Sequence, residues 1–185
     1  QIQAIFPGGI GCLTQTKESR EDDLENGWQQ LCDKHITKDD IVVGFSASGT
    51  TPFVLSILKH CRKEGIPTGC IVNNPHSPIA EWADYAVEVI TGPEFVTGST
   101  RMKAGTSQKL ILDMISTTLQ IRQGRVEGNK MVNAKLINHK LIDRACRIFM
   151  ERNSEYKDYE EVRQLILKAG SVKKAEMMIS RHFDM

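Results

Sequence analysis

Hydrophobic positions up to about residue 130 alternate between short β-branched runs and longer stretches with helical spacing. The short runs predict strands over residues 2–6, 41–45, 70–72 and 85–90. The longer stretches predict helices over residues 22–34, 52–64 and 103–122, and a short helix capped by Ser77-Pro78 that runs to Ala83. Strands and helices that alternate over short connections predict an α/β fold, a doubly wound parallel sheet flanked by helices. The 41–45 run shows little polar alternation, so we expect both faces of the sheet to be covered.

From residue 133 onward the pattern is entirely helical. Apolar spacing predicts an amphipathic helix over residues 134–152, a break at Lys157-Asp158, and two short helices over residues 159–169 and 172–182. Helices of that length are not stable alone, so we expect them to form part of a small helical module. The chain is therefore divided into a sheet domain over residues 1–132 and a C-terminal helical region over residues 133–185.

Composition narrows the classes of function. The 185 residues are 40% hydrophobic and carry a formal net charge of +1, which argues against nucleic acid or an anionic membrane surface as the main partner. The sequence contains no apolar run of the ~20 residues that span a bilayer and no signal-peptide pattern. Five cysteines, odd in number and without CxxC spacing, predict free thiols in a reducing cytoplasm, and neither disulfides nor a metal site.

The most informative short motif joins the 41–45 strand to the helix that begins at Pro52. We expect Thr51 to be the N-cap and Pro52 the first helical residue. A loop of this kind brings backbone N–H groups and hydroxyls to the positive end of a helix dipole, where phosphate binds well. The candidate binding residues are Ser46, Ser48, Gly49, Thr50 and Thr51. The competing interpretation is an ordinary connection in which Gly and Ser serve only the turn.

A second polar segment, residues 92–109, follows the 85–90 strand and leads into the long helix. In an open α/β sheet, ligands bind at this carboxyl edge. Its hydroxyls, two cations and helix start suit a polyhydroxylated, anionic small molecule. The candidate residues are Glu94, Ser99, Thr100, Arg101 and Lys103. The competing interpretation is a capped helix start with solvated Arg101 and Lys103.

The 92–109 segment resembles the signature shared by bacterial N-acetylmuramic acid 6-phosphate etherases and the animal glucokinase regulatory protein, both built on the sugar isomerase (SIS) fold. The loop Ser48-Gly49 with Thr51-Pro52 is similar to the sugar-phosphate loop of this family, and Asn74-Pro75 to its Asn-Pro turn. Residues 126–132 and 169–175 are similar to etherase segments beyond the long helix. The resemblance covers nearly the whole chain.

The resemblance implies one catalytic residue. Glu18 to Asp22 is similar to the E-x-x-E-D pattern of the family, which makes Glu21 the candidate. Judged from its residues alone, this run is only an acidic helix start, where carboxylates favour the dipole. Two features depart from the family. Thr50 stands where etherases usually carry arginine, and the first phosphate loop of the family, with its other catalytic glutamate, has no counterpart in the chain. We therefore expect a fragment that lacks the N-terminal part and is inactive alone.

The function implied by the resemblance is that of an enzyme, a carbon–oxygen lyase of the EC 4.2.1 type. It would cleave the lactyl ether of N-acetylmuramic acid 6-phosphate to N-acetylglucosamine 6-phosphate and D-lactate by elimination and hydration. A small-molecule sugar phosphate is the implied partner, with no metal or other cofactor. The implied form is a cytoplasmic homodimer acting in N-acetylmuramic acid catabolism and cell wall recycling.

Two other functions are compatible with the same fold. One is a non-catalytic sugar-phosphate-binding regulator that resembles the glucokinase regulatory protein, although that protein has two SIS domains and this chain is too short for two. The other is an aldose–ketose isomerase, which the 92–109 signature disfavours.

Overall fold

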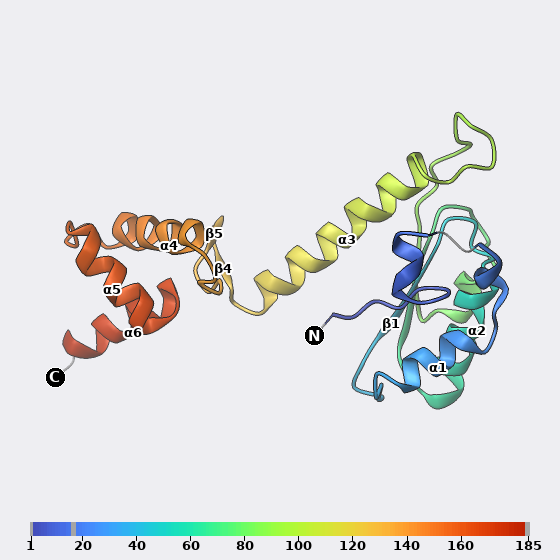
Figure 1. Cartoon of the computed structure of the whole chain (residues 1–185), viewed down its shortest axis with the longest axis horizontal. Coiled ribbons are helices and arrows are strands. Elements are labelled where there is room, and N and C mark those ends of the chain that lie inside the picture. Colours follow the sequence, from blue (N-terminus) through green and yellow to red (C-terminus); the bar gives the residue numbers. More distant parts are fainter. Residues whose placement is uncertain (1, 16–17, 184–185) are drawn as a thin grey trace. The chain divides into compact units, whose positions relative to one another are not determined.

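The computed structural model describes residues 2–15 and 18–183 of the chain, which forms two compact units, Gln1–Leu112 and Asp113–Met185 (Figure 1). The first unit holds a three-stranded parallel sheet in the order β1-β2-β3. Its strands are β1 (Val42–Ser46), β2 (Thr68–Val72) and β3 (Tyr85–Glu88). The expected α/β fold with a parallel sheet is thereby confirmed. The division predicted after residue 132 stays a prediction.

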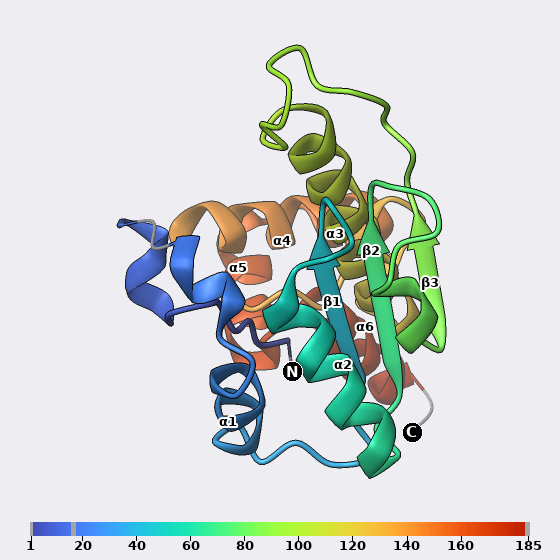
Figure 2. The ribbon, with the colours of Figure 1, turned by 90° about the vertical axis from the view of Figure 1, so that its right-hand side faces the viewer.

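Helix α2 (Pro52–Glu64) lies across β1 and β2, as Figure 2 shows, and its bounds are those predicted. Pro52 occupies the first turn, and Gly65 ends the helix in the left-handed conformation at φ 70°. Buried side chains of α2 form two clusters, one with the sheet and one with α1 (Asn26–Cys32). The members are Leu58, Cys70, Val72 and Ile79 in the first, and Leu31, Phe53, Ile57, Cys61 and Ile66 in the second. Helix α2 therefore contributes to both clusters and supplies four of their nine members.

The opposite face of the sheet departs from the expectation of two covered faces. Val43 of β1 is 37% exposed and Val87 of β3 is 45% exposed, whereas β2 is buried throughout. Because side chains alternate along a strand, Val43 points away from the face on which Gly44 meets Val54 and Leu58 of α2. The lack of alternation between polar and apolar residues in β1 therefore does not mean that both faces of the sheet are buried within this unit.

The N-terminal segment differs from its prediction. Residues 2–6 form no strand, because in the described chain β1 pairs only with β2 and a strand needs a ladder partner. Two 3-10 turns follow, η1 (Ile10–Leu13) and η2 (Glu18–Asp22). Helix α1 begins at Asn26 rather than residue 22, since Asp23 Oδ1 accepts the Asn26 N–H at 3.1 Å and forms a turn there. The predicted short helix before β3 is a 3-10 turn, η3 (Ala80–Trp82).

Helix α3 (Lys103–Arg122) has the predicted bounds. Its predicted apolar stripe is largely exposed, with Leu110 at 53% and Met114 at 59%, and Ala104 in the first turn is buried. The helix therefore forms over the predicted residues, while its apolar stripe lacks the burial that the pattern predicts.

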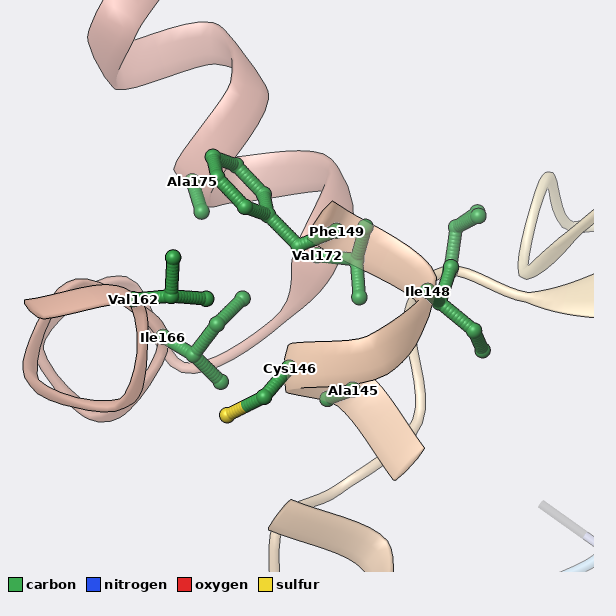
Figure 3. Close-up of a cluster of buried hydrophobic side chains, with 9 residues drawn as sticks. Ala145, Cys146, Ile148, Phe149, Val162, Ile166, Val172 and Ala175 are labelled. Atoms are coloured by element: carbon green, nitrogen blue, oxygen red, sulfur yellow. The ribbon is translucent and has the colours of Figure 1, made fainter. Parts of the chain in front are cut away.

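The second unit packs three helices around one core, drawn in Figure 3. They are α4 (His139–Arg152), α5 (Tyr159–Ala169) and α6 (Val172–Phe183), preceded by a hairpin of β4 (Val126–Glu127) and β5 (Lys130–Met131). The predicted helix over 134–152 begins later, because Asn138 Oδ1 accepts the Leu141 N–H at 2.9 Å and caps α4 there. Asp158 caps α5, and Gly170 ends it at φ 82°.

An ion-pair network joins the hairpin to the helices in this unit. Arg152 of α4 donates from Nε to Glu176 of α6 at 2.7 Å and from an Nη to Glu127 of β4 at 2.8 Å. Lys173 of α6 also reaches Glu127, at 3.1 Å. Hydrogen bonds from Lys173 and Arg152 lower the pKa of Glu127. One guanidinium therefore links three elements.

Phe149 is fully buried and meets the Tyr156 ring edge-on, with ring centroids 5.3 Å apart. We expect Phe149→Ala to lower the free energy of unfolding by about 3–5 kcal/mol, because it removes a large core side chain and leaves a cavity. Urea unfolding of the protein measures this. Phe95→Ala is the matched control, since Phe95 is 96% exposed and its loss should change stability by less than about 0.5 kcal/mol.

The lowered pKa of Glu127 predicts a pH-dependent contribution to stability. A carboxylate whose pKa is lower in the folded state stabilises the fold above its usual pKa of about 4.3 and loses that contribution as pH falls through the folded pKa. Glu127→Gln should therefore be less stable than the parent at pH 7, and the gap should narrow as pH falls toward 3. Glu155→Gln, at an exposed residue without an ion pair in the described chain, should show no such narrowing. A gap that stays constant with pH would contradict the prediction.

Candidate functional site

The β1–α2 loop brings four hydroxyl groups together. Ser46 Oγ accepts the Gly49 N–H at 3.0 Å and shares a 2.8 Å hydrogen bond with Thr51 Oγ1. Ser48 Oγ accepts the Thr50 hydroxyl at 2.9 Å and the Thr50 N–H at 3.2 Å. Ser46 is buried, whereas Ser48 and Thr50 are exposed. The structure therefore places all five predicted loop residues in one hydrogen-bonded turn.

The first turn of α2 begins directly after this cluster. Thr51 occupies the predicted N-cap position, but its side chain makes no capping hydrogen bond, because its hydroxyl is paired with Ser46. Pro52 has no N–H to satisfy, and the next backbone donors of the turn are those of Phe53 and Val54. Uncapped N–H groups at the positive end of a helix dipole are suited to an anion.

Gly49 is required by its backbone and by its neighbour. Its φ is 74°, in the region that disfavours other residues. A Cβ atom added to Gly49 would lie 2.2 Å from the Cβ of Ser77. The loop can thus pack against the segment after β2 only with glycine at this position.

The segment after β2 forms the wall on which the loop rests. Asn74 Nδ2 donates to the carbonyls of Ala47 and Ser48 at 3.3 Å each, and the Ile79 N–H donates to the Gly49 carbonyl at 3.1 Å. The sequence indicates Asn74 only as part of an Asn-Pro turn. Its place at the carboxyl end of a parallel strand was the available signal for a site residue.

Asn73 ties the end of β2 to the start of α3. Its Nδ2 donates to the Val89 carbonyl at 2.9 Å and to Ser107 Oγ at 2.7 Å, while its Oδ1 accepts from Gln108 Nε2 at 2.9 Å. Asn73 is buried, so these bonds fix the long helix to the sheet edge. The sequence does not indicate Asn73, Ser107 or Gln108 as site residues, because the contacts join positions more than 30 residues apart in the chain.

Glu94 takes the start of α3 as its partner. Its two carboxylate oxygens accept the N–H groups of Lys103 at 3.0 Å and Ala104 at 3.1 Å. These backbone hydrogen bonds lower the pKa of Glu94, and the one from Lys103 has the largest effect. The Lys103 ammonium donates to the Pro93 carbonyl at 2.9 Å. These contacts are those of a capped helix start, and the predicted substrate-binding roles of Glu94 and Lys103 stay predictions.

A cleft of about 160 Å³ lies where the two polar segments and the wall meet. Its lining comes from the β1–α2 loop, the end of β2 and the segment before α3, and comprises Ala47, Asn73, Asn74, Thr91, Gly92, Pro93, Glu94, Gly98, Thr100 and Ala104. Of the predicted binding residues, Glu94 and Thr100 line the cleft. The predicted binding residues that do not line it are Ser46, Ser48, Gly49, Thr50, Thr51, Ser99, Arg101 and Lys103. The volume is below the roughly 300 Å³ of complete ligand sites, so this cleft fits part of a ligand.

Glu21, the predicted catalytic residue, is exposed on η2. This turn contacts α2, and the Leu24 carbonyl just beyond it accepts the hydroxyl of Ser56 on that helix. Glu21 is therefore on a segment anchored to the helix that begins at the hydroxyl cluster. Its catalytic role stays a prediction.

Three further features bear on the chemistry. Over residues 2–15 and 18–183, no three His, Cys, Asp or Glu side chains are arranged to hold a metal ion. In the same part of the chain, no helix has the length and apolar character to cross a bilayer. All five cysteines are free; Cys61, Cys70 and Cys146 are buried, and burial raises the pKa of Cys61 to about 11.

The part of the chain that carries this site matches a known protein family. The SIS domain family matches residues 27–117, which include β1, the hydroxyl loop, the wall and the start of α3. Residues 27–117 of the chain form a SIS domain. The resemblance expected from the 92–109 segment is thus confirmed, and the parallel sheet described above is that of a SIS domain.

Several curated relatives of this SIS protein carry the name N-acetylmuramic acid 6-phosphate etherase. The one from Bacteroides thetaiotaomicron is 51% identical over 98% of this chain and 65% of its own length. Those from Porphyromonas gingivalis and Christiangramia forsetii are 51% and 49% identical over 93% and 94% of this chain, and 62% of their own length. The chain therefore spans less than two thirds of these relatives.

The steric role of Gly49 in the SIS domain can be tested directly. Gly49→Ala should lower the free energy of unfolding by more than about 1 kcal/mol, because it adds strain at positive φ and a contact with Ser77. Gly92→Ala is the matched control: Gly92 has φ 68°, but an added Cβ would meet nothing within 4 Å. Equal losses in the two variants, measured by denaturant unfolding, would show that the contact with Ser77 carries no weight.

Proposed function

We propose that the protein is an N-acetylmuramic acid 6-phosphate etherase, which releases D-lactate and leaves N-acetylglucosamine 6-phosphate. Relatives of that name are about half identical over nearly the whole chain. The observation that carries the proposal is the hydroxyl cluster at the uncapped start of α2, beside the cleft at the sheet edge. That arrangement fits the phosphate of a sugar phosphate.

The loop would bind and position the sugar phosphate. Ser46, Ser48, Gly49, Thr50 and Thr51 offer hydroxyls and backbone N–H groups to the phosphate oxygens, which are charged and accept strong hydrogen bonds. Holding the phosphate fixes the reacting carbons of the sugar and lowers the entropic cost of reaching the transition state. Thr50 stands where etherases usually carry arginine, so in this protein neutral donors take a larger share of phosphate binding.

The segment before α3 would hold the rest of the ligand. Thr100 lines the cleft, Ser99 and Arg101 flank it in sequence, and Lys103 follows three positions later. Glu94 contributes by fixing the first turn of α3 through its two backbone hydrogen bonds. This segment then supplies hydroxyl and cationic groups to the sugar and lactyl oxygens.

The reaction is an elimination followed by a hydration, the chemistry of a lyase of the EC 4.2.1 type. In the open-chain sugar, the C1 aldehyde acidifies the C2 proton, which a carboxylate base removes. The electron pair forms the C2–C3 double bond and expels lactate from C3 as an acid protonates the leaving oxygen. Water then adds at C3, and C2 regains a proton. Every step is a proton transfer, an elimination or an addition, with no net oxidation or reduction, so the reaction needs no redox cofactor.

Glu21 is assigned to the base. It is an exposed carboxylate on a segment anchored to α2, the helix whose start forms the phosphate site. The other catalytic glutamate of the family, which has no counterpart in these 185 residues, would then act as the acid. We further propose a cytoplasmic homodimer acting in N-acetylmuramic acid catabolism and cell wall recycling, as the resemblance implies.

The test is release of D-lactate from N-acetylmuramic acid 6-phosphate by the full-length protein, measured with a coupled assay in the presence of a chelator. Glu21→Gln should keep the fold and lose roughly 10²–10⁴ in rate, the scale of general acid–base catalysis. If Glu21 is the base, this variant should also lose deuterium exchange at C2.

Glu25→Gln is the matched control, because Glu25 is an exposed carboxylate on the same segment. It should turn over normally. The parent protein could instead fold and bind N-acetylglucosamine 6-phosphate but release no lactate from the substrate. That result would contradict the etherase proposal and favour a sugar-phosphate-binding regulator. Normal turnover by Glu21→Gln would show that Glu21 is only a helix-start carboxylate.

A further inference from the structure

Ser77 is a buried polar residue beside the hydroxyl cluster that has no assigned role. Its side chain is 3% exposed, and its Oγ has no hydrogen-bond partner among the residues that the structure describes. Buried hydroxyls are nearly always paired, because an unpaired one forfeits its bonds to water without replacement. An apolar side chain of similar size would be favoured here if the position served packing only.

The position of Ser77 is fixed from two sides. A Cβ built on Gly49 would lie 2.5 Å from Ser77 Oγ, so the hydroxyl rests against the Cα of the central loop residue. The Ile79 N–H holds the Gly49 carbonyl, and Asn74 holds the carbonyls of the two preceding residues. Ser77 thus faces the middle of the loop between two of its anchors.

The backbone before Ser77 is strained. His76 has φ 54°, in the left-handed region that non-glycine residues occupy at a cost, and its N–H is held by Glu88 Oε1 at 2.9 Å. Strain of this kind persists where the surrounding structure enforces it and gathers at ligand-binding segments. Here it lies directly before Ser77, whose hydroxyl is unpaired in the described chain.

The donors already present in the loop are partly occupied. Ser46 and Thr51 bond each other, and Thr50 donates its hydroxyl to Ser48. The Ser77 hydroxyl has no such partner in the described chain, so it can donate to a ligand without breaking a bond. Rotation about χ1, a change between staggered rotamers, re-aims the hydroxyl without moving the backbone.

We propose that Ser77 is a ligand-binding residue whose hydroxyl donates a hydrogen bond to the phosphate oxygens held by the 46–51 loop. The phosphate site then has two walls, the β1–α2 loop and the segment after β2, with Ser77 as the binding group of the second. This inference rests on the proposed function, since it names a further residue of the same site.

The test is Ser77→Ala in the full-length protein, with inorganic phosphate and N-acetylglucosamine 6-phosphate as probes in calorimetry. Losing a hydrogen bond to a charged ligand should weaken both affinities roughly 10- to 100-fold. The melting temperature of the ligand-free variant should be unchanged or higher, because an unpaired buried hydroxyl has been removed. A merely structural serine would give the opposite pattern, a lower melting temperature and unchanged affinity.

Ser171→Ala is the matched control. Ser171 is 2% exposed, like Ser77, but its Oγ accepts the Lys174 N–H at the start of α6. Its loss should lower the melting temperature and leave phosphate affinity unchanged. Ser77→Gly, which also removes the hydroxyl, replaces Ser77→Ala if that variant does not fold.

The outcomes separate the two proposals. A parent protein that binds both probes, together with Ser77 variants that bind within twofold of it, overturns the role of Ser77 and leaves the etherase proposal standing. A folded parent that binds neither probe and releases no lactate overturns both. If the Ser77 variants bind both probes more weakly and melt at the temperature of the parent, the result supports Ser77 as a phosphate-binding residue in the segment after β2.

Discussion

The close approach of Gly49 to Ser77 is the constraint on which the carboxyl edge of the sheet depends. A side chain at position 49 would hold the β1–α2 loop away from the segment after β2. The hydrogen bonds from Asn74 and Ile79 to the loop carbonyls need that same approach. The arrangement of the loop hydroxyls is therefore set by packing between two consecutive connections, and the composition of the loop supplies only the groups.

The sheet is covered unequally. Leu58 of α2 packs against Cys70 and Val72 on one face, while Val43 and Val87 stay partly open on the other. Helix α3 similarly carries an apolar stripe that is largely exposed. The open face of the sheet and the stripe on α3 both carry hydrophobic side chains that the structure leaves exposed. The chain spans less than two thirds of the length of its relatives.

Local signals account for what the sequence predicted well. The bounds of α2 follow from Pro52 and Gly65, and those of α5 from Asp158 and Gly170, because caps act within a few residues. The prediction of a strand over residues 2–6 was wrong, because a strand needs a neighbouring strand to pair with, and the hydrophobic pattern of a segment does not identify that neighbour.

The β4–β5 hairpin was missed, although a glycine at φ 59°, Gly128, is followed by Asn129 in its turn. In the candidate site, the hydroxyl loop and the edge of the sheet were predictable, because both are read from adjacent residues. The contacts of Asn73 with Ser107 and Gln108, and of Gly49 with Ser77, join distant positions and became visible only in three dimensions.

The placement of the thiols gives each unit its own chemical reporter. Cys61 and Cys70 are buried in the first unit and Cys146 in the second, whereas Cys32 is exposed. The thiolate is the reactive form, and burial that raises the pKa of Cys61 to about 11 suppresses it along with access. Alkylation of Cys61 and of Cys146 thus proceeds through transient opening of the unit that contains each, so the two labelling rates record the local stability of the two halves independently.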